Sequence, residues 1–167
     1  MALPKKLKDM RTFVDGNRYA GEVAEVTLPK LAIKTEAYRG GGMLGEVDID
    51  MGVDKLEAEV KAGGLLKELF RGFGATTHDA VLVRFTGAYQ SESGGVQALE
   101  AVMRGRVAEI DPGSAKPGAD TEHTFKYSLT YYRLDIDGVN EIEIDLVGGT
   151  FVVGGVDRRA EINALLG

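Results

Sequence analysis

The chain has no cysteine, no tryptophan and only 4 prolines among its 167 residues. Without cysteine it can form no disulfide, carry no thiolate nucleophile and hold no cysteine-ligated metal. This usage fits a protein made in the cytosol. Because proline is scarce, the 23 glycines provide most of the turn and loop signals.

Long apolar runs and an excess of positive charge are also missing. No stretch approaches the roughly 20 apolar residues of a membrane span. The basic start, with Lys5 and Lys6, is not followed by the apolar core of a signal peptide. We therefore expect neither classical secretion nor insertion into a bilayer. The net charge of −6 argues against the strongly basic face of a sequence-reading nucleic-acid binder.

The motifs of common enzymes and metal sites are absent as well. No HExxH, GxSxG or Walker sequence occurs, and His78 and His123 stand far apart in polar stretches. The glycines at 40–45 lack the Lys-Ser/Thr pair and the helix of a phosphate-binding loop. The acidic residues at 48–54 lack the spacing of an EF-hand. We expect no catalytic site, no cofactor and no bound metal.

What the chain does have is alternation with a period of two, which predicts β-strands. The hydrophobic fraction of 44% and charged fraction of 28% describe one globular domain. An Asp-Gly turn predicts a hairpin at residues 11–21. Longer strands are predicted at 53–62, 80–90, 96–111, 122–135 and 141–146. Gly105 lies inside one of them and suggests a bulge or a close backbone approach.

Helical spacing is confined to residues 65–73 and 156–166. About eight strands against one or two short helices predict a mainly β protein, an antiparallel sandwich or barrel with helices at its margins. The long strands carry aliphatic side chains on one face and charges of both signs on the other. Such a polar face is either an ordinary solvent face or the lining of a channel.

Residues 27–43 form the most unusual segment. Leu31, Ile33 and Thr35 alternate with polar or small residues, which predicts a strand. That strand runs into Tyr38, Arg39 and three consecutive glycines, with no sequence of its own left to pack against. It is either flexible or ordered by another molecule.

An ordered set of short motifs then points to one family. The set contains LPKL at 28–31, KTE at 34–36, YR at 38–39, GGM at 41–43, DMG at 50–52, MRG at 103–105, EIDPG at 109–113, YY at 131–132 with Leu134, DG at 137–138, EID at 143–145 and GVD at 155–157. In this order and spacing the chain resembles the major tail tube proteins of contractile-tailed bacteriophages and R-type pyocins. The resemblance spans nearly all of residues 1–167, which are expected to form one tail-tube domain.

The resemblance implies a fold related to the tube proteins of type VI secretion, and hexameric rings that stack into a hollow tube. The strands of six subunits would join into one shared inner β-barrel. Such a tube is a conduit for double-stranded DNA in a phage, or for ion leakage in a pyocin. The implied partners are further copies of the chain, the tail sheath protein, baseplate and tail-terminator proteins, and non-specific double-stranded DNA in transit. The implied location is the virion tail or pyocin particle, assembled in the host cytoplasm.

Two sets of residues receive roles from the resemblance. Residues 35–50 would form an arm that reaches a neighbouring subunit, with contacts from Tyr38, Arg39, Gly40, Gly41, Gly42 and Met43. Eight residues on polar strand faces are candidates for the lumen: Lys55, Glu57, Glu59, Lys61, Arg84, Glu100, Arg104 and Arg106. Lys5 to Lys8 and the loop at 112–120 are candidates for further contacts between rings or with the sheath.

Two other functions are considered. The chain could be another ring-forming β protein of the same superfamily, such as a type VI secretion-type tube or a tail-terminator component. It could also be a monomeric binding module, which predicts no self-association.

Overall fold

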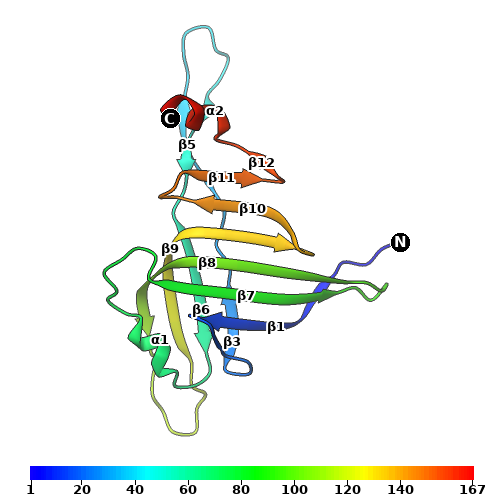
Figure 1. The fold of residues 1–167 in the computed structure, drawn as a ribbon, viewed down its shortest axis with the longest axis vertical. Helices are drawn as coiled ribbons and strands as arrows, with labels where there is room; N and C mark the ends of the chain where they lie inside the picture. The colour runs from blue at the N-terminus through cyan, green and yellow to red at the C-terminus, as the bar shows by residue number, and fades with distance from the viewer.

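A computed structural model describes residues 1–167. Its largest element is an antiparallel sheet, here called the main sheet, with the strand order β12-β11-β10-β9-β8-β7-β1-β2 (Figure 1). Its strands are β1 (Lys6–Val14), β2 (Asn17–Arg18), β7 (Val81–Gln90), β8 (Val96–Asp111), β9 (His123–Ile136), β10 (Val139–Asp145), β11 (Thr150–Val153) and β12 (Val156–Asp157).

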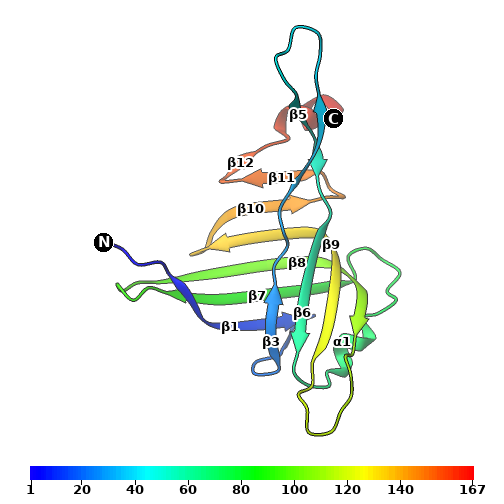
Figure 2. The same ribbon diagram turned by 180° about the vertical axis from the view of Figure 1, so that it is seen from behind.

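A shorter layer covers part of the main sheet. It consists of β3 (Val23–Thr27) and β6 (Leu56–Ala62), which pair with each other, while β6 also pairs with the first half of β9. Figure 2 shows β3 and β6 running across the strands of the main sheet. Two short helices, α1 (Lys67–Arg71) and α2 (Ala160–Leu166), lie at the margins. Neither has the length or apolar character needed to cross a bilayer.

The two layers are joined because β8 and β9 bend. Their register shifts between Arg104 and Gly105, and again between Val107 and Glu109. Bulges of this kind let one strand serve two sheets that pack across each other. A Cβ at Gly105 would clash with the carbonyl oxygen of Ser128 and would lie 2.8 Å from the Cα of Leu129. Only glycine therefore fits at this corner, where the sequence predicts a bulge or a close approach.

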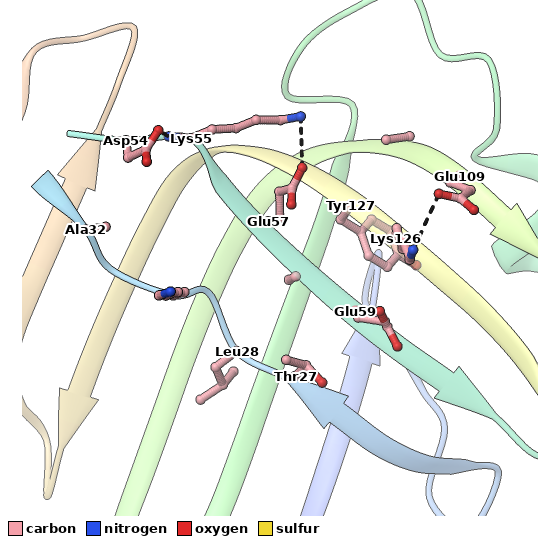
Figure 3. A pocket seen from close by; sticks show the side chains of 13 residues that line it. Thr27, Leu28, Ala32, Asp54, Lys55, Glu57, Glu59, Glu109, Lys126 and Tyr127 are labelled. Atoms are coloured by element: carbon pink, nitrogen blue, oxygen red, sulfur yellow. Dashed lines mark hydrogen bonds and ion pairs between the residues drawn. The ribbon is translucent and has the colours of Figure 1, made fainter. Parts of the chain in front are cut away.

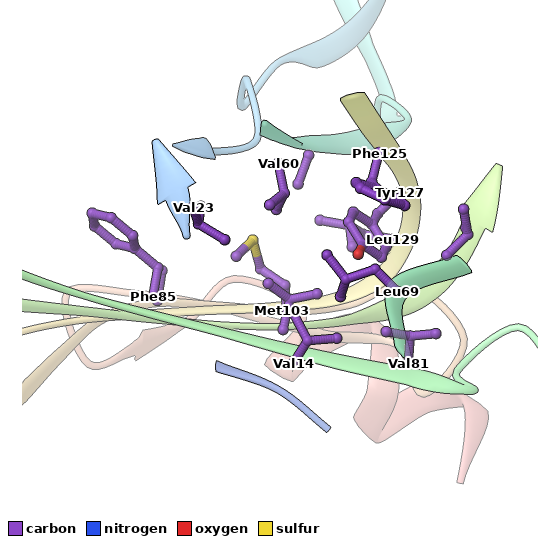
Figure 4. Close-up of a cluster of buried hydrophobic side chains, with 14 of the residues drawn as sticks. Val14, Val23, Val60, Leu69, Val81, Phe85, Met103, Phe125, Tyr127 and Leu129 are labelled. Carbon is purple, nitrogen blue, oxygen red and sulfur yellow. The ribbon is translucent and has the colours of Figure 1, made fainter. Parts of the chain in front are cut away.

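The core fills the space between the layers (Figure 4). Leu56 and Val60 of β6, Val83 of β7, Met103 of β8 and Leu69 of α1 are buried in one apolar cluster. The alternation of each strand places its core side chains on its inner face. Thr12 of β1 is a buried polar residue on the same face.

Most of the long elements agree with the sequence predictions. The strands expected at 80–90, 96–111, 122–135 and 141–146 are present within a few residues. The hairpin turn has positive φ at Asp15 (49°) and Gly16 (82°), as two-residue hairpin loops require. The Asp15 carboxylate also accepts a hydrogen bond from the Leu82 backbone N–H at 3.0 Å, which fixes the turn against β7.

Three strands were missed and both helices were predicted too long. β3, β11 and β12 contain five, four and two residues, too few to show a period. Instead of a helix over 156–166, Val156 and Asp157 form β12 and the helix begins at Ala160. The helix expected at 65–73 is limited to five residues, with Gly72 as its C-cap.

Gly105→Ala tests the corner. We expect it to lower the free energy of unfolding by about 3 kcal/mol, because the added methyl has no space between two backbones. Gly41→Ala is the matched control, since nothing lies within 4 Å of a Cβ there and no positive φ is required. Urea unfolding of both variants would measure the difference. Equal stability of the two would show that the corner can relax.

Candidate assembly surfaces

The segment that the sequence leaves without a partner is a two-stranded ribbon, here called the arm. It consists of β4 (Ile33–Tyr38) and β5 (Val47–Val53), which pair only with each other. In Figures 1 and 2 the arm extends beyond the rest of the molecule and ends in a loop. Every residue of β4 is exposed, and so is every residue of β5 except Val53. A lone two-stranded ribbon is marginally stable in water.

The predicted contact residues lie together at the end of the arm. The Met43 N–H donates to the Gly40 carbonyl oxygen at 3.2 Å, and the Arg39 Nε donates to the Met43 carbonyl oxygen at 3.4 Å. A Cβ at Gly40 would lie 3.1 Å from the Tyr38 hydroxyl and 3.5 Å from the Met43 sulfur. Tyr38, Gly40 and Met43 therefore form one compact turn.

The three glycines differ in what they do. Gly42 has a φ of 83°, which a side chain would strain. Gly40 leaves room for the aromatic ring of Tyr38 and the sulfur of Met43. Gly41 has open space around it and no unusual backbone angle. The loop thus needs two of its three glycines for its own conformation.

The two faces of the arm differ in character. The register places Tyr38 opposite Val47 and Glu36 opposite Ile49 on one face. Tyr38, Val47, Ile49 and Met51 are 57%, 48%, 44% and 54% exposed. On the other face Ala37 is opposite Asp48 and Thr35 is opposite Asp50. The arm is therefore an amphipathic ribbon with no cover for its apolar side.

A second surface is the outer face of the main sheet, which points away from the core. Arg84, Glu100 and Arg104 lie here, on β7 and β8. The Arg84 Nε is 3.2 Å from the Glu100 carboxylate, and an Arg133 nitrogen is 3.8 Å from it. Arg133 also lies 3.2 Å from Asp135. The charges form a row of alternating sign across three strands.

Tyr131 extends the same polar face toward β10. Its hydroxyl donates to a Glu143 carboxylate oxygen at 3.3 Å. Partial burial, followed by the nearby Glu143 charge, raises the pKa of Tyr131. The phenol therefore stays neutral and remains a hydrogen-bond donor at ordinary pH.

A third surface is the outer face of β6. Glu57, Glu59 and Lys61 alternate with the buried residues of this strand, and Lys55 precedes it. A hollow of about 570 Å³ lies here, lined mainly by polar and charged residues. Its ion pairs, drawn in Figure 3, are Lys55–Glu57 at 2.8 Å and Lys126–Glu109 at 3.5 Å.

The eight lumen candidates thus do not share one face. Arg84, Glu100 and Arg104 belong to the outer face of the main sheet. Lys55, Glu57, Glu59 and Lys61 belong to the opposite layer, because the inner face of β6 packs toward the inner face of the main sheet. Arg106 follows the corner and stands in one row with Ser128 and Glu57.

Sequence reasoning missed part of the main-sheet surface. Arg133, Asp135 and Glu143 were not among the candidates, although they continue the charge row. Their strands showed the alternation, but the bulge in β9 shifts the outward positions from even to odd numbers after Thr130. Only cross-strand register reveals that Arg133 is next to Glu100.

Together, the fold and these surfaces describe a mainly β protein with two charged faces and a projecting arm. The family model of the phage tail tube protein FII matches residues 4–167. The chain is 45% identical over 162 residues to the tail tube protein of Escherichia phage P2, covering 95% of this chain and 94% of that protein. It is 46% identical over 150 residues to the major tail tube protein of Serratia phage KSP20, covering 88% and 86%.

The chain therefore belongs to the phage tail tube protein FII family. It is a structural protein of the contractile phage tail, and its place is the virion tail. A solved structure, the anti-feeding prophage baseplate symmetrised six-fold, contains a chain of similar fold, with a TM-score of 0.50 and 9% identity. The similarity covers 75% of this chain and 90% of that one.

The arm should be the least protected strand pair of the unassembled protein. We expect its amides to exchange with solvent roughly 100-fold faster than those in the middle of β8, because nothing but its own ladder covers them. Hydrogen exchange read by mass spectrometry at low protein concentration would measure this. Equal protection of β4 and β8 would mean that the arm has a partner within its own chain.

Proposed function

We propose that six copies of the chain close into a ring, and that the rings stack into the hollow inner tube of a contractile tail. The tube serves as the conduit for double-stranded DNA. The observation that carries this proposal is that the main sheet has a free edge on each side. A sheet with two free edges can join its neighbours into a closed barrel, which removes those edges.

One free edge is β1. Strand β2 pairs only with Phe13 and Val14, so the outer edge of β1 from Lys6 to Arg11 has no strand beside it. At the other edge, β12 pairs with just Val152 and Val153. By contrast, the layer of β3 and β6 has one free edge, because its other side continues into β9. Of these two layers, the main sheet is the one that can propagate from copy to copy in both directions.

This topology favours one face for the lumen. The inner face of the main sheet is covered by β6 and the core, so the outer face is the one that a closed barrel can turn toward its axis. Arg84, Glu100 and Arg104 would then line the lumen, together with Arg133 and Asp135. The same geometry favours a position on the outside of the tube for the other five candidates.

The charge row on this face suits a conduit. Arg84 lies beside Glu100, and Arg133 lies beside both Glu100 and Asp135, so two positive charges meet two negative ones. Arg104 stands outside these ion pairs. Free cations in a narrow channel would hold DNA phosphates by counterion release. A row of paired charges presents a wetted surface with little net attraction for the passing duplex.

The outer face of β6 would face the sheath. It carries Lys55, Glu57, Glu59 and Lys61, and Arg106 continues it past the corner. The arm would reach a subunit of the adjacent ring through Tyr38 and Met43. Lys5 to Lys8 and the loop at 112–120 remain candidates for further contacts between rings or with the sheath. Baseplate and terminator proteins would bind the two ends of the tube.

Replacing residues 38–44 by a two-residue turn tests the arm. We expect the purified wild-type protein to form rings and tubes in negative-stain micrographs. The shortened variant should lose stacking. At concentrations too low for assembly, its circular dichroism and thermal unfolding midpoint should match those of the wild type, since the arm contributes little to the core. Normal tubes from the shortened protein would contradict a role for the arm.

The absence of native cysteine permits a clean test of the lumen. In assembled tubes, Arg84→Cys should react with a small maleimide but not with one carried on a large polymer, which cannot enter the channel. Glu57→Cys, the matched control on β6, should react with both reagents. The unassembled variants should not differ. Reaction of Arg84→Cys with the large reagent in intact tubes would place this face outside the lumen.

A further inference from the structure

An apolar groove lies where the arm leaves the body of the molecule. Its floor consists of Ile142 and Ile144 of β10 with Phe151 and Val153 of β11, and its wall includes the arm residues Ile33 and Val53. All eight lining residues are hydrophobic, and its volume is about 210 Å³.

The groove is open because the covering layer is shorter than the main sheet. β6 pairs with β9 only from His123 to Leu129. The inner faces of β10 and β11 lie beyond the end of that layer, and only the root of the arm passes over them (Figure 2). The inward face of the sheet therefore continues past the part that this chain covers.

The end of the arm carries apolar side chains that nothing in this chain covers. Leu44 in the terminal loop is 99% exposed, and Tyr38 and Val47 beside it are also exposed. The arm cannot fill its own groove, since its root forms the groove wall. Tyr38 is five residues further along the strand than Ile33, which places it about 17 Å away at 3.3 Å per residue.

Unpaired charges of opposite sign lie at the two places. The hollow next to the groove shares Ile33, Val53, Ile144 and Phe151 with it and is lined by two arginines, Arg158 and Arg159, and two aspartates, Asp50 and Asp145. Both aspartates accept backbone hydrogen bonds within their own turns. The distal arm carries Glu46 and Asp48. Neither these two residues nor the two arginines form an ion pair within the chain. The Arg159 Nε is also buried without a hydrogen-bond partner.

We infer that the groove is the receptor for the arm of a second copy of this chain, with Leu44 entering the apolar floor and the acidic residues of the arm meeting Arg158 and Arg159. The inference builds on the proposed tube, in which the arm reaches the adjacent ring. It adds the surface that receives the arm and the residues that recognise it.

Donor and receptor are different surfaces of the same chain, so the contact is head-to-tail. A head-to-tail contact gives a ring if its rotation closes and an open stack if it does not. Because the proposed function assigns ring closure to the free edges of the main sheet, we assign the groove to the stacking of rings.

Mixing two single-cysteine variants tests the docking. Leu44→Cys and Val153→Cys are combined with a short bis-maleimide, and the products are separated by denaturing electrophoresis. We expect a strong dimer band joining one copy of each. Leu44→Cys with Glu57→Cys is the control and should give at least roughly tenfold less. Equal yields from the two mixtures would overturn the inference.

A charge placed on the arm tests the contribution of Leu44 to assembly. Leu44→Asp should raise the protein concentration needed for tube formation by roughly tenfold or more, since an apolar side chain would no longer be buried. Leu65→Asp is the control, because Leu65 is also exposed, at 79%, but lies beside α1. An unchanged threshold for Leu44→Asp would overturn the inference.

These measurements separate the inference from the proposed function. If wild-type protein forms tubes and the two mixtures cross-link equally, the tube stands and the groove is not the receptor. If wild-type protein forms no tubes, the proposed function fails. The cross-linking of two copies would still decide whether the arm enters the groove.

Discussion

The corner at Gly105 is the constraint on which the rest of the structure depends. It brings the backbone of β8 so close to Ser128 and Leu129 that no side chain fits. The bend lets β8 and β9 contribute to both layers, which closes the core between them without a second sheet. It also turns the outer face of β6 away from the outer face of the main sheet. One chain therefore presents two charged surfaces in different directions.

Local pattern predicted much of this fold. The alternation in β7 and β8 predicts both strands, and the sequence also predicts a bulge or a close approach at Gly105. The Asp-Gly turn at residues 15–16 and the arm could also be predicted from the sequence. Short strands such as β11 could not, because four residues are too few to show the alternation that distinguishes a strand from a loop.

The surfaces could be predicted only in part. Tyr38 and Met43 lie together because they are close in sequence, and their contact with a neighbouring subunit stays a prediction. The lumen candidates come from two different faces of the molecule. Alternation predicts which residues point away from the core, but it does not predict on which outer surface they lie. Arg106 shows the difficulty: it follows Arg104 in the same alternating row, yet the bend moves it to the side of Glu57. The direction in which a side chain points depends on the bulges. The position of each bulge is set by pairing with a strand that is distant in the sequence.

The incompletely covered inner face of β10 and β11 would have a thermodynamic consequence in the proposed tube. A core that is completed by another molecule gives a folded state whose stability includes a binding term. That term grows with the logarithm of the free concentration of the partner. The unfolding temperature of such a protein is then a property of the solution as well as of the sequence. If the groove is filled by a second copy, a dilute subunit would be the least stable form of the chain and the assembled tail the most stable.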